Sequence, residues 1–132
     1  MKTNLDALFK TDSKAEKEGI WFEVSDTAAF KVRRFGGQNS PRVKAALALK
    51  YKPFTRQIEL GTMPQEKELK IFAEVFIDSS VVDWRGIEID GKEVEFSKEK
   101  CLELFISMPD LFDAIHKYAS DLNTYKEQLG NS

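Results

Sequence analysis

The chain is organised around one stretch that joins a tight turn to alternating side chains, Asp83-Trp84-Arg85-Gly86-Ile87-Glu88-Ile89-Asp90-Gly91-Lys92-Glu93-Val94-Glu95-Phe96-Ser97. At its centre, Asp90-Gly91 is a strong signal for a two-residue β-hairpin, because a type I′ turn needs positive φ at both central positions. This turn pairs Ile87 with Val94 and Ile89 with Lys92. A loop one residue longer would scramble the two faces, so the register is well specified.

The predicted hairpin has one apolar and one acidic face. The apolar face carries Ile87, Ile89, Val94 and Phe96, and the acidic face carries Glu88, Glu93 and Glu95. Glu88 opposite Glu93 is mildly unfavourable in this register. We therefore expect the acidic face to be wet or to meet a basic partner.

Length and composition predict one domain that needs neither disulfide nor metal. A chain of 132 residues can bury a sizeable core, and its ten phenylalanines favour a core or a sticky surface built on aromatic rings. The single Cys101 excludes an internal disulfide and a multi-cysteine metal site. No apolar run approaches the ~20 residues needed to cross a bilayer, and the start lacks a signal-peptide core. A soluble cytoplasmic protein is expected.

The formal net charge of −2 hides a strong asymmetry. Residues 27–58 contain no acidic residue and eight basic ones: Lys31, Arg33, Arg34, Arg42, Lys44, Lys50, Lys52 and Arg56. Most of the compensating negative charge follows Glu59. Such segregation indicates an interaction surface for nucleic acid, for an acidic partner or for the acidic half of a second copy.

The pattern along the chain predicts an α+β fold that is predominantly helical. Residues 1–18 are polar and are expected to form a mobile N-terminal tail, and residues 19–132 to form one domain. Alternating side chains at 20–24 and 30–32 predict an N-terminal β-hairpin, which could join the central hairpin in one sheet. Four to five helices are expected to supply the rest.

Turn and cap signals place these helices. Ser40-Pro41 starts a helix that Pro53 kinks or ends, and Gly61 closes the element. The Thr62–Gln65 capping-box pattern opens a strongly apolar helix that runs into Trp84. Ser97 caps a short helix. A last helix begins at Pro109, and its apolar stripe continues for about five turns to Leu129.

No group of residues indicates catalysis, a metal or a cofactor. His116 is the only histidine, so one chain cannot build a Ser-His-Asp, Cys-His or multi-histidine site, and we expect a surface or boundary histidine. Cys101 is expected to pack in the core. Gly36-Gly37 lacks the spacing of a phosphate-binding loop and fits a turn better. A non-enzymatic protein is therefore predicted.

The basic segment has two interpretations. In the first, residues 31–56 belong to a small nucleic-acid-binding or regulatory module whose aromatic residues stack on bases. The acidic sequence pI of about 5.5 opposes this interpretation. In the second, the basic half of one copy meets the acidic half of another, which gives head-to-tail contacts that close into rings or continue as spirals.

The succession of motifs resembles the tail assembly chaperones of long-tailed bacteriophages and prophages. The resemblance covers residues 28–127 and rests on Val32-Arg33-Arg34-Phe35-Gly36-Gly37-Gln38-Asn39-Ser40, Gly61, Trp84-Arg85-Gly86-Ile87, Asp90-Gly91-Lys92-Glu93, Phe96-Ser97 and Pro109-Asp110-Leu111-Phe112. It implies a non-enzymatic homo-oligomer, spiral or ring, that binds the tape-measure protein in the host cytoplasm and is absent from the mature virion. An extended form of such a chaperone recruits tail-tube subunits.

The candidate interaction residues combine the charge pattern with this resemblance. They are Arg33, Arg34, Arg42, Lys44, Trp84, Glu88, Glu93 and Glu95. We expect the basic members to meet the acidic members of a neighbouring copy, and Trp84 to help form an apolar surface for a helical client. The alternative for Trp84 is that its ring packs the hairpin onto the helices. Neither nucleic acid nor a membrane is an expected partner.

Overall fold

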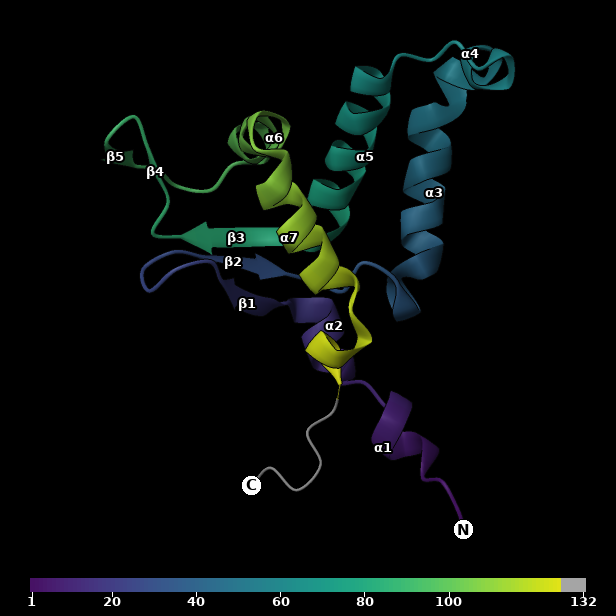
Figure 1. Ribbon diagram of the computed structural model, residues 1–132, viewed down its shortest axis with the longest axis vertical. Coiled ribbons are helices and arrows are strands. Elements are labelled where there is room, and N and C mark those ends of the chain that lie inside the picture. The colour runs from purple at the N-terminus through teal and green to yellow at the C-terminus, as the bar shows by residue number, and fades with distance from the viewer. Residues whose placement is uncertain (127–132) are drawn as a thin grey trace.

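The computed structural model describes residues 1–126 and confirms the predicted class, a predominantly helical α+β fold (Figure 1). The helices are α1 Leu5–Phe9, α2 Ser13–Glu18, α3 Ser40–Tyr51, α4 Thr55–Leu60, α5 Gln65–Ser80, α6 Lys98–Ser107 and α7 Pro109–Ser120. The strands are β1 Ile20–Glu23, β2 Ala29–Val32, β3 Val81–Arg85, β4 Glu88–Ile89 and β5 Lys92–Glu93. Short 3-10 turns follow at Gly37–Asn39, Lys52–Phe54 and Leu122–Tyr125.

The central hairpin has the register that its turn predicts. Ile89 pairs with Lys92 and Glu88 with Glu93, and the Val94 amide donates to the Ile87 carbonyl at 2.9 Å. Asp90 and Gly91 both have positive φ, 52° and 79°, as a type I′ turn requires. The hairpin projects from one side of the molecule (Figure 1).

The two hairpins do not join in one sheet, and this expectation is wrong. β1 and β2 form the predicted hairpin, but their third strand is β3, which places Phe30 opposite Trp84. The sequence pattern assigned residues 81–84 to the preceding helix, whereas α5 ends at Ser80. Two consecutive β-branched valines favour extended backbone here, and periodicity alone does not separate a short apolar strand from a helix.

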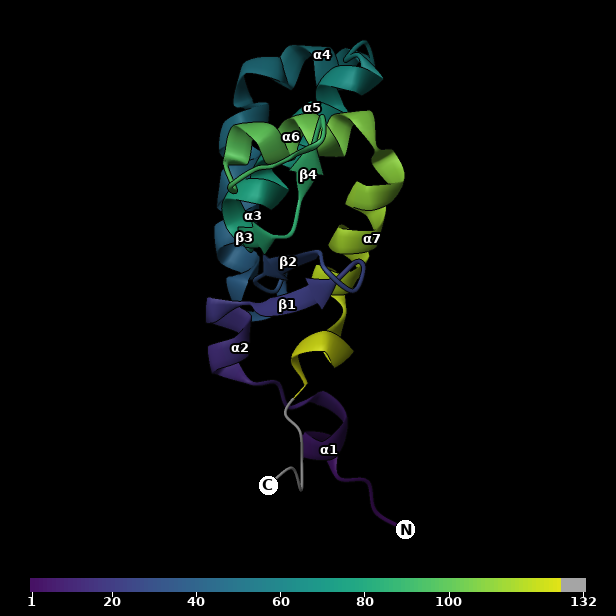
Figure 2. The same cartoon turned by 90° about the vertical axis from the view of Figure 1, so that its left-hand side faces the viewer.

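α5 is the central element of the core. It packs against α3 and α6 on its flanks and runs into β3, and Figure 2 shows α3 and α7 on opposite sides of α6 and the sheet. Its inner side chains Ala73, Phe76 and Ile77 are buried. Cys101 lies in this core as predicted, and burial raises the pKa of its thiol to about 12, so it is an inert packing residue.

The turns around α4 follow the sequence signals in part. α3 ends at Tyr51, before Pro53, and Gly61 closes α4 with a left-handed φ of 68°. The capping box at Thr62 does not form, because the Thr62 hydroxyl donates instead to the Gln57 carbonyl at 3.4 Å. This bond ties the α4–α5 connection to α4.

The last helix is shorter than its apolar stripe predicts. α7 ends at Ser120, because Asp121 adopts extended backbone and its carboxylate accepts from the Asn123 amide at 2.9 Å. The following turn buries Tyr125, whose hydroxyl donates to the Val32 carbonyl at 2.8 Å. Leu129, the predicted end of the stripe, lies outside the described residues.

The N-terminal segment, which the sequence predicted to be a mobile tail, contains two short helices. α2 lies against the sheet and the following turn through Glu16, a buried carboxylate, and Gly19 joins it to β1. α1 lies beyond it at the end of the molecule (Figure 1). The boundary at residue 18 and the mobility of this segment stay predictions.

Candidate protein-interaction surfaces

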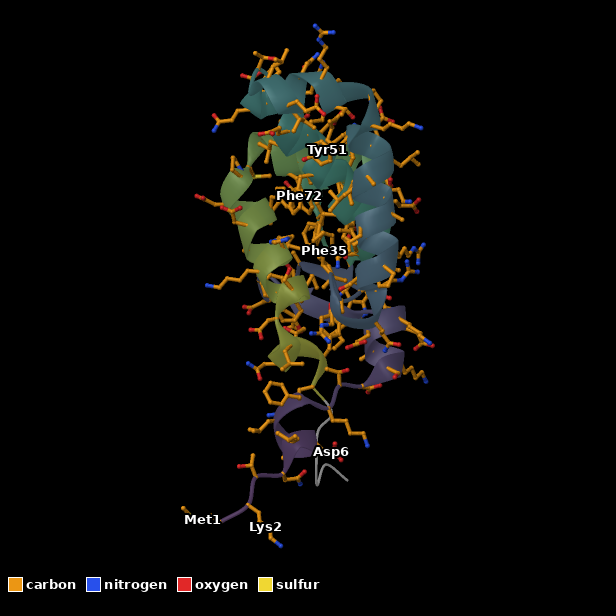
Figure 3. All side chains as sticks on the ribbon, turned by 90° about the vertical axis from the view of Figure 1, so that its right-hand side faces the viewer. Met1, Lys2, Asp6, Phe35, Tyr51 and Phe72 are labelled. Atoms are coloured by element: carbon orange, nitrogen blue, oxygen red, sulfur yellow. The ribbon has the colours of Figure 1, made fainter. Side chains whose placement is uncertain are left out.

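A groove lies between the C-terminal end of α3 and the first turns of α5. Figure 3 shows Tyr51, Phe72 and Phe35 in a line between the ribbons of α3 and α7. The upper part of this line is hollowed by a pocket of about 590 Å³, lined by Tyr51, Gln65, Glu66, Glu68, Leu69 and Phe72. We call these six residues the aromatic groove. A volume of this size lies within the range of ligand pockets, about 300–1,000 Å³.

Position along α5 separates the floor of the aromatic groove from the core. The apolar stripe of α5 runs along one face of the helix at spacings of three and four residues. Leu69 and Phe72 line the groove near the N-terminal end of this stripe, whereas Ala73 and Phe76, further along the helix, are buried. The Phe72 ring lies 5.8 Å from Phe35. Leu69 remains 37% exposed. The floor is therefore held in place by aromatic rings, and Leu69 adds exposed apolar surface to it.

His116 extends this aromatic floor beneath Phe72. Its imidazole lies 5.2 Å from the Phe35 ring, 5.3 Å from Phe72 and 5.4 Å from Phe76, measured between ring centroids. Burial lowers the pKa of His116, and the charge of Asp113 opposes this shift without cancelling it. The ring is therefore uncharged at neutral pH and packs as an aromatic side chain, in agreement with the predicted boundary histidine.

The opening of the aromatic groove is acidic. Glu66 and Glu68 lie in the first turn of α5, where the helix dipole favours negative charge, and both are exposed. Burial and then the charge of Glu68 raise the pKa of the Tyr51 phenol. The groove thus combines an apolar floor with a negatively charged rim, which suits an apolar stripe flanked by basic residues.

Five of the predicted interaction residues lie on exposed surface. Glu88, Glu93 and Glu95 are exposed on the central hairpin, and we call them the acidic hairpin face. Arg42 and Lys44 are exposed on α3, and we call them the basic α3 face. Figure 1 shows the hairpin and α3 on opposite sides of the molecule. The two faces therefore do not meet within one copy.

Arg33 and Arg34 contact the N-terminal segment of their own chain. Arg34 Nη1 donates to Glu16 Oε1 at 2.7 Å, and Gln38 Nε2 donates to Glu16 Oε2 at 2.6 Å. Arg33 Nε donates to the Lys17 carbonyl at 2.8 Å. Arg34 in particular holds α2 in place, and its role in a contact between copies stays a prediction.

The Glu16 carboxylate is ionised despite its burial. Its side chain is 1% exposed, and this desolvation opposes ionisation. Hydrogen bonds from Thr11, Arg34 and Gln38, together with the charge of Arg34, outweigh desolvation and hold the pKa of Glu16 below its usual range. The network locks α2 to the segment that follows β2.

Trp84 packs the hairpin onto the sheet, which was the alternative to a client-binding role. Its side chain is 4% exposed, and its Nε1–H donates to the Val94 carbonyl at 2.9 Å. Its ring meets Phe30 at 5.7 Å and Phe96 at 5.3 Å, both edge-to-face. Trp84 thus offers almost no surface to a partner.

Sequence reasoning missed the aromatic groove itself. The apolar stripe of α5 was assigned to the core along its whole length, although its N-terminal end lines the groove through Leu69 and Phe72, and Leu69 is 37% exposed. The available signal was the pair of acidic residues, Glu66 and Glu68, directly beside Leu69. An apolar helix whose first turn mixes acids with a large apolar residue is typical of a partly exposed end.

The described residues show neither a metal cluster nor a membrane-spanning helix. Residues 1–126 contain no group of three or more His, Cys, Asp or Glu side chains that could hold a metal ion. Within the same residues, no helix combines the length and apolarity needed to cross a membrane.

Comparison with known proteins gives one family. The family model described as YdaY prophage protein matches residues 38–131, a span that includes α3 to α7, the aromatic groove and the central hairpin. No curated protein and no solved structure matches the chain. The matched span begins after Arg33 and Arg34 and excludes α1, α2 and the N-terminal hairpin.

Proposed function

Because this chain belongs to the YdaY prophage protein family and is therefore a phage or prophage protein, we propose that it is a tail assembly chaperone. It acts without catalysis, self-associates in the host cytoplasm, and keeps the tape-measure protein soluble during tail morphogenesis. An extended form recruits tail-tube subunits, and the chaperone leaves before the virion matures. The observation that carries this proposal is the aromatic groove, and the motif succession from residue 28 to residue 127 supports it.

The aromatic groove suits the apolar stripe of a client helix. A helix-in-groove contact inserts side chains at positions i, i+3, i+4 and i+7 into an apolar trough. Leu69 and Phe72 provide the trough, and Tyr51 forms its wall on the α3 side. A tape-measure protein has a long helical chain with repeated apolar stripes, so many such contacts are available along it.

Self-association supplies avidity for that long client. The acidic hairpin face and the basic α3 face lie on opposite sides of one copy, so complementary charge favours heterologous, head-to-tail contacts. Such contacts generate spirals or rings. Linking several aromatic grooves in a row raises the effective concentration of each next groove, which compensates for weak single contacts.

Charge reversal on the basic α3 face is expected to weaken self-association without unfolding the chain. The variant Arg42→Glu/Lys44→Glu should sediment as smaller species than wild type, because both side chains are exposed and would now repel Glu88 and Glu93 of a neighbour. The control is Lys117→Glu, an exposed reversal on α7. Adding salt from about 0.1 M to about 1 M should also shrink the wild-type oligomer. An oligomer that is insensitive both to salt and to this reversal would contradict the charge contact.

Co-expression with the tape-measure protein encoded by the same prophage is the direct test of the function. The soluble fraction of that client should rise severalfold when the chaperone is present and should co-purify with it. No change in client solubility would count against the proposal. Retention of DNA or RNA by the purified chain at physiological salt would favour the nucleic-acid alternative.

A further inference from the structure

The N-terminal helix α1 has an apolar face without a partner in its own copy. Leu5, Leu8 and Phe9 are spaced i, i+3 and i+4, so they share one face, and they are 64%, 47% and 62% exposed. Asn4 caps the helix by accepting from the Asp6 amide at 3.1 Å. A helix of five residues is too short to be stable alone in water, so its face requires a contact.

The chain geometry prevents α1 from filling the Tyr51 end of the aromatic groove of its own copy. Directly after α1, Thr11 bridges Lys126, and the Asp12 amide donates to the Tyr125 carbonyl at 2.7 Å. Because the chain is anchored at this point, α1 can reach only as far as its own length, about 1.5 Å per helical residue. Figure 3 shows Met1, Lys2 and Asp6 at one end of the molecule and Tyr51 near the other end.

We propose that α1 of one copy occupies the aromatic groove of a second copy. The apolar face of α1 then covers Leu69 and Phe72, the exposed floor of the groove. Charge favours this occupant, because residues 1–14 hold three lysines against two aspartates, while exposed Glu66 and Glu68 line the groove opening. Two features that lack a partner in one copy thus cover each other between copies.

This contact is heterologous, because it joins one end of a copy to a different surface on the next. Each copy has one α1 and one aromatic groove, so contacts of this kind propagate head to tail. The inference rests on the proposed self-association and names its apolar contact, in addition to the charged faces. A client helix therefore has to displace α1 from the aromatic groove, and the charged faces then keep neighbouring copies linked while their grooves hold the client.

The test uses two full-length variants, each lacking one half of the contact. Leu5→Ser/Leu8→Ser/Phe9→Ser removes the apolar face of α1, and Leu69→Gln places an amide in the groove. Each variant alone should self-associate at least about tenfold more weakly than wild type, measured by sedimentation over a range of concentrations. In about 1 M salt, which screens the charged faces, an equimolar mixture should form heterodimers that do not grow further, because only one α1–groove pair remains.

Matched controls exclude general effects of these substitutions. Val24→Ser removes an apolar side chain of 41% exposure between β1 and β2, and Ile106→Gln alters a 40% exposed position on α6. Both should assemble like wild type. All five proteins should give the same circular dichroism spectrum apart from the small α1 contribution.

The outcomes separate the inference from the proposed function. Unchanged, salt-sensitive oligomers of the α1 and groove variants would overturn the α1 contact while leaving charge-driven assembly intact. A mixture that fails to form heterodimers, although both variants are folded and monomeric, would also overturn the contact. A wild-type chain that stays monomeric at every concentration would remove both the contact and the proposed self-association.

Discussion

Replacing Arg34 by alanine is expected to lower the free energy of unfolding by about 3–5 kcal/mol, because it leaves the buried Glu16 carboxylate without its counter-charge. Glu16 would keep the Gln38 hydrogen bond, which does not neutralise a buried charge. The loss should appear as a lower urea midpoint, and α2 should exchange its amide hydrogens faster than the core helices.

The adjacent Arg33 provides the matched control. Its guanidinium donates to the exposed Lys17 carbonyl and has no buried carboxylate as a partner, so Arg33→Ala should cost about 1 kcal/mol or less. Equal destabilisation by the two substitutions would contradict the structural role assigned to Arg34.

Acid should reduce the difference between wild type and Arg34→Ala. The folded-state pKa of Glu16 is lowered, so its ionised form stabilises the fold fully above the unfolded carboxyl pKa of about 4.3. This stabilisation is lost as the pH falls through the folded pKa. Urea curves measured from neutral pH into that acid range should therefore converge for the two proteins, and a constant difference would argue against ionised Glu16.

Trp84→Ala is the second substitution with a large expected effect, about 3–5 kcal/mol of lost unfolding free energy. It removes a ring that lies between Phe30 and Phe96, and it leaves the Val94 carbonyl without its indole donor. The central hairpin should then detach from the sheet, and nuclear magnetic resonance should show collapsed chemical-shift dispersion for residues 87–96.

Trp84→Phe separates packing from hydrogen bonding. It keeps an aromatic ring beside Phe30 and loses the bond to Val94, so most of the stability should be retained. A Trp84→Ala variant as stable as wild type, with an unchanged hairpin, would show that the Trp84 ring does not hold the central hairpin to the sheet.

The sequence predicted the hairpins and several helix starts because these depend on local chemistry. Asp90-Gly91 determines its own turn, and the Ser97 hydroxyl accepts from the Lys100 amide at 3.1 Å as its cap pattern implied. The sequence did not predict β3, because its valines continue the apolar run of α5. The sequence also did not predict where α7 ends, because a single aspartate, Asp121, ends the helix through the hydrogen bond that its own side chain accepts.

Among the candidate interaction residues, the sequence predicted exposure correctly only where exposure follows from the local sequence pattern. Arg42, Lys44 and the glutamates of the acidic hairpin face are exposed as expected. The contact of Arg34 with Glu16 was not predicted, because Glu16 lies eighteen residues away in a segment that was expected to be a tail. The aromatic groove depends on how α3 packs beside α5, which no local pattern contains.

The soluble yield of the co-expressed tape-measure protein, compared between two chaperone variants, tests the central claim that the aromatic groove holds the client. Leu69→Gln alters the groove and Ile106→Gln alters an equally exposed apolar position on α6, so the two substitutions are matched in chemistry and in exposure. We expect Leu69→Gln to lose most of the rescue and Ile106→Gln to retain it. The α1 variant Leu5→Ser/Leu8→Ser/Phe9→Ser, which loses the same contact between copies but keeps the groove, should also retain it. Equal rescue by Leu69→Gln and Ile106→Gln, at equal chaperone levels, would contradict the claim.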